Sequence, residues 1–329
     1  MGTPDVVCNT YLENPMRFAD VINHGIFGGL PVIDPKKLEA MDSGSSVYGG
    51  TKKARDIVKK YYDGKVVIGI IGIEDQTRIH YAMPLKNMWY DLYSYEKQRQ
   101  DIARYHTKFK DLQGDEWLSK FGKEDKLIPV ITLTVYYGTK TWDGPKTLHE
   151  MLSIPPGLKR FQPLFCNYHA HLLQITEIQD LESYSDDLKI VFGFVKYQKE
   201  KEALLNYVQE NKELFQSVSD ENYYVIKQLT RSDEIDRYRK NEESEGMNVC
   251  KALQDLKEEG REEGRTEGKT QNLAEQIMKK LKKGLDIKTI AEHVEESEAF
   301  VQEICNVIRE NPEADSKEVF EMFLKKQMQ

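Results

Sequence analysis

The spacing of apolar and polar residues predicts a chain that alternates between helices and strands. Residues 14–27 follow a helical period, with Asn14 placed to cap the helix and Pro15 in its first turn. Residues 54–61 and 65–76 are predicted as two strands of a hairpin, because Asp63-Gly64 is a strong turn signal between them. The second strand is almost all Val, Ile and Gly up to Ile73, which is typical of a central strand buried on both faces.

The period then becomes helical again. From residue 83 to residue 105, Met88, Leu92 and Tyr95 are predicted to share one face of a helix. The segments that follow are predicted as a buried strand, a shorter strand and two long helices, over residues 127–138, 171–178, 186–197 and 199–215. This order of elements predicts an α/β fold with a mixed sheet flanked by helices.

Two regions lack this alternation. Residues 41–53 are rich in Ser and Gly and are predicted as a loop. After residue 232 charges crowd together, and Gly260, Gly264 and Gly268 repeat every four residues in KEEGREEGRTEGKTQ. The repeated glycines weaken helix propensity by about 1 kcal/mol each relative to Ala, so this charged arm is interpreted as a solvated helix or linker.

The last segment is amphipathic again and predicts a small helical tail. A helix-turn-helix is one interpretation of residues 272–308, but the would-be reading helix, residues 298–308, carries acids and no Lys or Arg. A small packing or dimerisation bundle is therefore preferred. The predicted organisation is a main domain over residues 1–232, a charged arm over 233–271 and a helical tail over 272–329.

Charge and cysteine content limit the function classes. The formal net charge is −8. Residues 1–150 carry 21 Lys+Arg and 20 Asp+Glu, a balance of +1, and the remainder therefore carries −9. The acidic second half argues against a main phosphate-contacting surface there. The four cysteines, Cys8, Cys166, Cys250 and Cys305, show no zinc-site spacing. No signal peptide or membrane-length apolar run is evident, so we expect reduced thiols in a cytoplasmic protein with no membrane partner.

Candidate chemistry gathers at one end of the predicted hairpin. Glu74 follows a strand without charges, and a turn at Asp63-Gly64 places it opposite about position 53, a few residues from Asp56. Twist or a bulge would bring the two carboxylates together. Such carboxylates repel each other unless a cation joins them, and Mg²⁺ typically takes one or two carboxylates together with water and phosphate. That arrangement suits phosphodiester hydrolysis.

Neighbouring residues fit the same interpretation. Gln76 lies two residues beyond Glu74 and so shares its strand face, where its amide can orient a water or donate to a phosphate. A run of basic residues adjoins Asp56, where a DNA backbone would lie: Lys52, Lys53, Arg55, Lys59 and Lys60. The alternatives are ordinary ones, because a strand-end acid is often at the surface and a charge run is usually a solvated face.

These residues carry a family resemblance. The pattern of RFADVINHGIFGG, then RDI, then GIEDQTRIHYAMPLKNMWYDLYSY, with EGREEGRTEG before a helical tail, resembles the PD-(D/E)XK nuclease superfamily. More narrowly, the chain resembles the recombination-promoting nuclease and putative transposase (Rpn) family. The resemblance spans most of the chain. It implies an αβββαβ-type core, Mg²⁺-dependent cleavage of DNA, and roles in recombination, mobile elements or defence against foreign DNA.

The resemblance also implies residue roles. Asp56 and Glu74 would bind Mg²⁺, or Mn²⁺ or Ca²⁺ in its place, with the main-chain carbonyl of Asp75 as a third ligand. Asp20 would be an accessory acid on the first helix, and Gln76 would stand where the wider superfamily usually has Lys.

On the following helix, Lys86 stands where the family tends to carry Arg, and would contact DNA together with Lys52, Lys53 and Arg55. The position of Gln76 leaves the general base unassigned, because an amide cannot take a proton.

Three functional hypotheses remain open at this point. The first is a metal-dependent DNA endonuclease. The second is a catalytically inactive nuclease-fold protein that serves as a DNA-binding or assembly module, which the Gln76 position and the net acidity favour. The third assigns DNA reading to the tail alone. The sequence also leaves room for a homodimer through the C-terminal helices.

Overall fold

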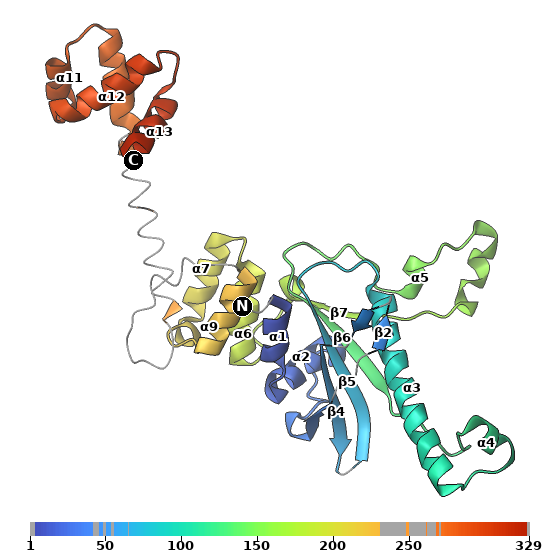
Figure 1. Cartoon of the computed structure of the whole chain (residues 1–329). Helices are drawn as coiled ribbons and strands as arrows, with labels where there is room; N and C mark the ends of the chain where they lie inside the picture. Colours follow the sequence, from blue (N-terminus) through green and yellow to red (C-terminus); the bar gives the residue numbers. More distant parts are fainter. Residues whose placement is uncertain are drawn as a thin grey trace. The chain divides into compact units, whose positions relative to one another are not determined.

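A computed structural model describes residues 4–41, 46–48, 51–53, 56–64, 66–230, 248–249, 261, 268–269 and 271–327. The chain divides into two compact units, Met1–Cys250 and Lys251–Gln329, and Figure 1 shows the elements of each. The predicted boundary between residues 232 and 233, and most of the predicted charged arm, lie outside the described residues.

The first unit is built on a five-stranded sheet with the strand order β1-β4-β5-β6-β7. Its strands are β1 (Leu38–Ala40), β4 (Ile57–Asp63), β5 (Val66–Gln76), β6 (Val130–Tyr136) and β7 (His171–Gln174). The β1–β4 and β4–β5 pairs are antiparallel, whereas β5–β6 and β6–β7 are parallel. The sheet is therefore mixed, and the predicted α/β class is confirmed.

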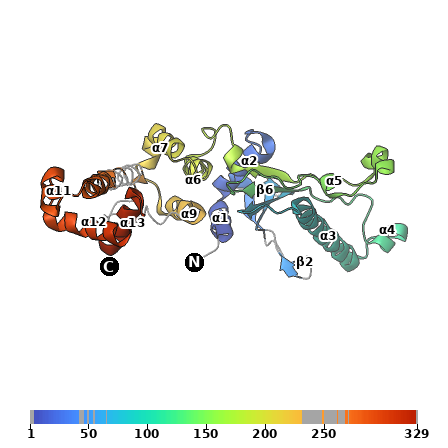
Figure 2. The same ribbon diagram turned by 90° about the horizontal axis from the view of Figure 1, so that it is seen from above.

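Helices cover both faces of this sheet (Figure 2). α2 (Pro15–Phe27) approaches so closely that a Cβ on Gly25 would lie 2.6 Å from Leu133 Cδ2 on β6. α3 (Met83–Phe109) packs on the opposite face, where Asn87 and Asp91 meet Thr134 and Thr132. Side chains alternate along a strand, so Leu133 and its two neighbours point to different layers.

Helix α2 begins and ends where its sequence predicts. Asn14 accepts a hydrogen bond from the Met16 N–H at the start of α2, and Gly28 ends the helix with φ of 62°. The helix preceding it is α1 (Pro4–Leu12). In the order α2, β1, β4, β5, α3, β6, the unit has one helix, three antiparallel strands, a crossover helix and a parallel strand.

The buried face of α3 differs from the predicted one. Met88, Leu92 and Tyr95 were predicted to share one face of a helix, and that face is not the buried one. Leu92 is exposed, and the helix buries Met83, Pro84, Asn87, Tyr90 and Asp91. The reason is the strand beneath it. β6 presents Thr132 and Thr134 to this face, and these hydroxyls offer polar partners to buried Asn and Asp side chains.

Other differences are local. The predicted loop over residues 41–53 holds a small separate hairpin of β2 (Ser46–Tyr48) and β3 (Thr51–Lys53), and the predicted strand over 171–178 becomes β7 followed by η3 (Ile175–Glu177). The long helix expected over residues 199–215 is split into α7 (Lys201–Glu210) and α8 (Lys212–Phe215). Three further short elements lie in the connections: η1 (Pro35–Lys37), α4 (Gly114–Ser119) and α5 (Leu148–Met151).

A buried arginine joins α1 and α2 to a layer of helices that follows the sheet in the first unit. This layer contains α6 (Asp186–Tyr197) and α9 (Asp220–Thr230). Arg17 on α2 donates two hydrogen bonds of 2.8 Å to Glu221 and one of 2.9 Å to Asp187. Its guanidinium also lies 4.0 Å from the centroid of the Tyr11 ring. This network joins four helices at one point.

The second unit has a hydrophobic core of its own. Residues 271–282 are helical, and α11 (Ile287–Val294), α12 (Glu298–Glu310) and α13 (Ser316–Gln327) follow. Ile277, Ile290, Val301 and Ile304 are fully buried at its centre. The predicted tail of short helices is thus a packed bundle. Among the described residues, every helix is too short or too polar to cross a membrane.

Candidate functional site

The β4–β5 register differs from the predicted one and moves Asp56 closer to Glu74 along the hairpin. Glu74 was expected opposite about position 53, but Ile57 pairs with Ile73, so continuing this register puts Asp56 opposite Glu74. Two features cause the difference. Asp63 pairs with Val66, which moves the turn along the chain, and a bulge between Tyr61 and Tyr62 adds a residue to β5.

Hydrogen bonds to the main chain of Asp75 hold the predicted residues together. The main-chain N–H of Asp75 donates to Asp56 Oδ2 at 3.0 Å, and Gln76 Nε2 donates to the Asp75 carbonyl oxygen at 2.7 Å. Asp56, Asp75 and Gln76 therefore meet at the carboxyl end of β5. Because Asp56 precedes the first residue of β4, this bond also fixes the entry into the hairpin.

The carboxylate of Asp75 lies on the other side of the strand from Gln76. It is 1% exposed, and it lies near the buried Tyr137 phenol. Burial, followed by the Asp75 carboxylate, raises the pKa of Tyr137 well above its usual value. For Asp75, the sequence predicts metal binding by the main-chain carbonyl and not by the carboxylate. That carbonyl accepts from Gln76 Nε2, and the N–H of the same residue donates to Asp56.

The main chain of Glu74 pairs with Thr134 of the neighbouring parallel strand. Above that strand, Asn87 Nδ2 donates a 2.9 Å hydrogen bond to Thr134 Oγ1, and both residues are fully buried. Thr132 Oγ1 and Tyr168 Oη each donate a 2.6 Å hydrogen bond to Asp91. These bonds fix the first half of α3 over β6, beside the strand end that carries Glu74.

Asn87 and Asp91 were not identified from the sequence, although their spacing carries a signal. Residues four apart share a helix face and residues two apart share a strand face, so Asn87 and Asp91 match Thr132 and Thr134 in spacing. Two polar residues on each element, at the period of that element, indicate a polar seam inside the core.

Asp20 lies on α2 with partners of its own. Its Oδ2 accepts a 2.8 Å hydrogen bond from the Ser185 N–H, and its Oδ1 lies 2.9 Å from His24 Nδ1. The His24 ring stacks on Tyr184 with 4.0 Å between centroids. In the part of the chain that the structure describes, these contacts do not connect Asp20 with Asp56 or Gln76, and its role as an accessory acid stays a prediction.

The predicted DNA-contacting residues are distributed over several elements. Lys52 and Lys53 belong to β3, where they pair with Val47 and Ser46, and Arg55 lies outside the described residues. Lys86 lies on α3, with Nζ 5.9 Å from the centroid of the Tyr90 ring.

One member of the predicted basic run lies inside the core. Lys59 is 4% exposed with Nζ 5.4 Å from the Phe18 ring centroid, and burial lowers its pKa. It is therefore not part of a DNA-facing surface.

The oxygen donors at the end of β5 have the chemistry of a hard-cation site. Those described are the Asp56 carboxylate and the Asp75 carbonyl, and hard oxygen ligands are what Mg²⁺ and Ca²⁺ prefer. Within the described residues, no group of three His, Cys, Asp or Glu side chains is placed to hold a metal ion. The side chain of Glu74 is not among those that the structure describes.

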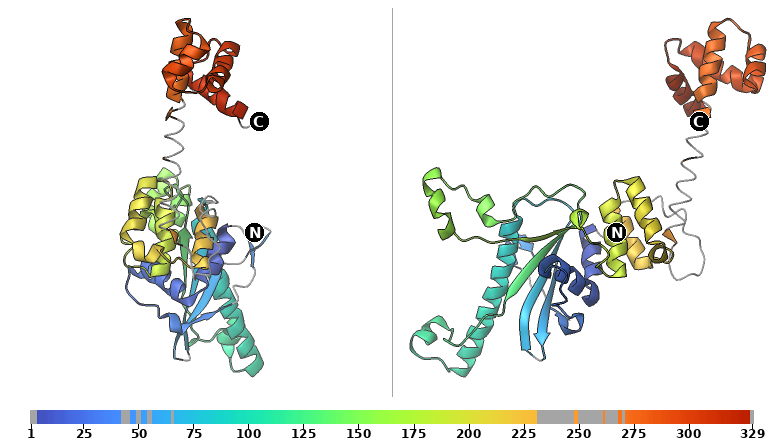
Figure 3. Two further views of the ribbon diagram at one scale, coloured as in Figure 1. Left: turned by 90° about the vertical axis from the view of Figure 1, so that its left-hand side faces the viewer. Right: turned by 180° about the vertical axis from the view of Figure 1, so that it is seen from behind.

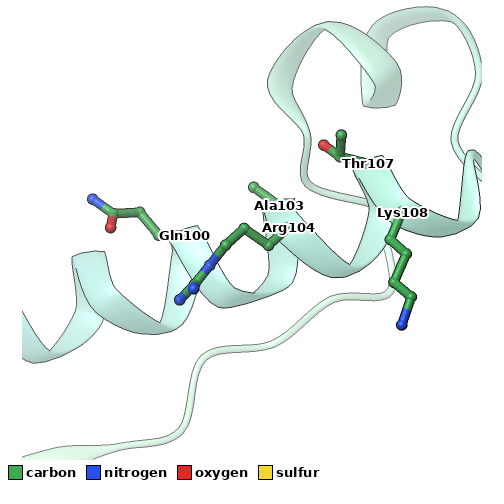
Figure 4. Close-up of a pocket in the computed structure, with 5 residues that line it drawn as sticks. All are labelled: Gln100, Ala103, Arg104, Thr107 and Lys108. Atoms are coloured by element: carbon green, nitrogen blue, oxygen red, sulfur yellow. The ribbon is translucent and has the colours of Figure 1, made fainter.

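A separate surface cavity lies far along α3. It has a volume of about 470 Å³ and is lined by Gln100, Ala103, Arg104, Thr107 and Lys108, which follow one stripe of the helix (Figure 4). None of these residues belongs to the end of β5. The cavity is open and shallow on one helix, so it adds no group to the candidate site.

Comparison with known families relates part of the chain to a family model. Residues 73–225 match the model of a family described as putative transposase, YhgA-like. No curated protein and no solved structure matches the chain. The matched region begins at Ile73, so it includes Glu74, Asp75, Gln76 and the whole of α3, and it extends into α9. This match supports the resemblance of the sequence to the Rpn and putative transposase family.

Proposed function

We propose that this protein is a metal-dependent DNA endonuclease with a PD-(D/E)XK-type site. The observation that carries the proposal is the hydrogen bond from the Asp75 N–H to Asp56 Oδ2, because it sets Asp56 beside the strand end that holds Glu74 and Gln76. The element order α2, β1, β4, β5, α3, β6 supports the same proposal, since it follows the αβββαβ order that the resemblance implies. The description of the matched family, putative transposase, is compatible with an enzyme that acts on DNA.

The metal in this proposal is Mg²⁺, with Mn²⁺ or Ca²⁺ as substitutes. Asp56, Glu74 and the Asp75 carbonyl would hold it, and these donors are all oxygens. When bound, such an ion acidifies a water and neutralises charge on the phosphoryl oxygens.

The chain's own groups would orient that site. The Asp75 N–H fixes one oxygen of Asp56, which limits the rotation of the carboxylate. Gln76 donates to the Asp75 carbonyl and so fixes the direction of that oxygen. Since an amide neither takes nor gives a proton at neutral pH, Gln76 is a positioning residue, and water or substrate phosphate would accept the proton.

Nicking of supercoiled plasmid tests the proposal. Purified wild type should nick DNA with Mg²⁺ or Mn²⁺, and Asp56→Asn and Glu74→Gln should each stop it. Asp63→Asn is the matched control, because Asp63 is an exposed acid at the opposite end of β4. Plasmid left uncut by wild type at high enzyme concentration, with each divalent ion in turn, would refute the hydrolytic function.

A second candidate function is a non-catalytic DNA-binding or assembly module with the same fold. The observation that favours it is Gln76, whose amide is engaged with the Asp75 carbonyl where the wider superfamily usually carries Lys. Calorimetry separates the two candidates. Divalent-ion binding that disappears in Glu74→Gln supports the endonuclease, whereas the absence of such binding in wild type supports the module.

A further inference from the structure

An arm of the first unit, residues 146–170, extends away from the sheet between β6 and β7. Its two sides pair at the base, where the Leu148 N–H donates to the Tyr168 carbonyl and the Ala170 N–H donates to the Lys146 carbonyl, both at 2.9 Å. Tyr168 also bonds to Asp91 on α3 at 2.6 Å. Figures 1 and 3 show the arm, which contains α5, projecting from the body of the unit. The base is thus fixed, and the arm is presented to solvent.

The outer part of the arm is η2 (Pro156–Leu164), and it buries none of its residues. A 3₁₀ helix repeats every three residues, so Leu158, Phe161 and Leu164 form one stripe. Their exposed fractions are 44%, 39% and 80%. Proline at positions 155, 156 and 163 restricts the backbone of this segment, so little conformational freedom remains to be lost on binding. A rigid, exposed apolar stripe indicates a binding surface.

The charge of the arm identifies the partner. Glu150, near the base of the arm, accepts a 2.7 Å hydrogen bond from the Lys146 N–H, and residues 151–176 beyond it contain no Asp or Glu, although the chain as a whole has a net charge of −8. The same segment carries Lys159 and Arg160 beside the apolar stripe, and the Arg160 guanidinium lies 4.6 Å from the Phe161 ring centroid. A cationic, acid-free segment on an acidic protein complements a polyanion. Apolar wedges next to Arg and Lys are the combination that proteins insert into a DNA groove.

The arm also begins near the candidate site, at the carboxyl ends of the parallel strands. Gln76, the last residue of β5, pairs with Tyr136, the last residue of β6, and the chain leads from there toward the arm. The base of the arm touches α3 through Asp91, four residues beyond Asn87. The arm therefore begins at the same end of the parallel strands as the candidate site.

We propose that the 146–170 arm is a duplex-DNA-binding element, in which Lys159 and Arg160 contact phosphates while Phe161 and Leu164 enter a groove. The choice of DNA among polyanions rests on the proposed function. Binding by the arm itself needs no metal and no bond cleavage, so it can be measured separately.

Binding of the full chain to a labelled duplex in EDTA tests the phosphate contacts. Lys159→Glu/Arg160→Glu should weaken affinity by about tenfold or more and lower the salt-dependence slope by about 2, one unit per contact. Lys199→Glu/Lys201→Glu is the control, since it makes the same change of net charge on exposed lysines at α7 and should leave the slope unchanged. Equal affinity and slope for wild type and the arm variant would overturn the proposal.

The apolar stripe has its own test. Phe161→Ala should weaken duplex binding by about fivefold to a hundredfold, within the range for a stacked or inserted side chain. Leu118→Ala removes an exposed apolar side chain from α4, outside the arm, and should have no effect. If Leu164→Glu converts a dimer to a monomer in sedimentation while duplex affinity is unchanged, the stripe is an interface between copies of this chain, and the proposal is wrong.

Failure of this inference can be distinguished from failure of the proposed hydrolysis. If wild type binds duplex through the arm but never nicks plasmid, DNA binding by the arm is supported and the endonuclease function is refuted. Equal rates of plasmid nicking by wild type and by the Lys159→Glu/Arg160→Glu variant, at enzyme concentrations below saturation, would support the endonuclease function and refute DNA binding by the arm.

Discussion

The main-chain N–H of Asp75 donates to Asp56 Oδ2 at 3.0 Å, and this bond joins the start of one hairpin strand to the end of the other. A carboxylate held by a peptide N–H is a charge-assisted acceptor, so the bond is stronger than one between neutral groups. The position of Asp56 in the candidate site therefore depends on the pairing of the two hairpin strands.

Asp56→Asn separates that structural role from catalysis. The amide oxygen can still accept from the Asp75 N–H, so we expect a loss of stability of only about 1 kcal/mol in urea unfolding. Plasmid nicking should fall by at least about a hundredfold, because a carboxylate that neutralises a metal is worth several kcal/mol. A variant that loses most of its stability would show that Asp56 is a structural residue.

Arg17→Met tests the network between α2, α6 and α9. The substitution keeps much of the apolar stem but leaves Asp187 and Glu221 without their common partner. Both acids are partly exposed, which limits the cost, so we expect a loss of about 2 kcal/mol in the free energy of unfolding. Arg99→Met is the control. Arg99 bonds Glu96 on the surface of α3, and its loss should leave the urea midpoint unchanged.

His106 should remain protonated above the usual pH range of histidine. Its Nδ1 lies 2.7 Å from Asp111 and its Nε2 lies 2.8 Å from Asp125, and only an imidazolium donates to both carboxylates. The hydrogen bond with Asp111 is the main cause that raises the pKa of His106. Titration of the His106 ring by NMR should therefore give a midpoint above about 6.5.

The sign of the linked stability follows from that shift. A raised pKa in the folded state gives stabilisation that is complete below the unfolded value and is lost as pH rises through the folded value. Wild type should consequently lose thermal stability relative to His106→Gln as pH is raised through that midpoint. A difference between the two proteins that stays constant across the window would contradict the prediction.

Gly25→Ala tests the contact between α2 and β6. The added Cβ would lie 2.6 Å from Leu133 Cδ2, and Leu133 is fully buried, so we expect a loss of about 1–3 kcal/mol. Leu133→Ala in the same chain should restore part of it by making room, which a double-mutant cycle in urea would measure. Gly157→Ala, where no atom lies within 4 Å, should leave stability unchanged.

Asn87 and Thr134 should show strong energetic coupling. Their side chains are fully buried and bonded to each other, so either Asn87→Leu or Thr134→Val leaves one polar group without its partner, at about 1–3 kcal/mol. The double variant should cost less than the sum of the two. Additive losses in urea unfolding would show that the seam does not act as a unit.

Sequence patterns predicted the elements better than their pairing. The all-apolar run before Glu74 and the Asp63-Gly64 turn identified the hairpin, because both signals are local. The register was wrong by three positions, since neither the exact turn residue nor a bulge leaves a mark in the hydrophobic pattern. Correcting it strengthens the grouping of Asp56 with Glu74 that the sequence proposed.

The buried face of α3 was missed for a different reason. Hydrophobic periodicity assumes that the inner face is apolar, and here it carries Asn87 and Asp91. Their burial depends on Thr132 and Thr134, which lie more than 40 positions away in the chain. A property shared between two distant segments is not visible in either segment alone.

The Arg17 network has a consequence for the growing chain. Its partners lie 170 and 204 positions further along the sequence, so Arg17 cannot be neutralised until nearly the whole first unit has left the ribosome. The β4–β5 hairpin needs only local contacts and can form much earlier, since domains fold progressively from the N-terminus during synthesis. The contacts that join α1 and α2 to the helical layer through Arg17 therefore cannot be completed until α9 has been synthesised.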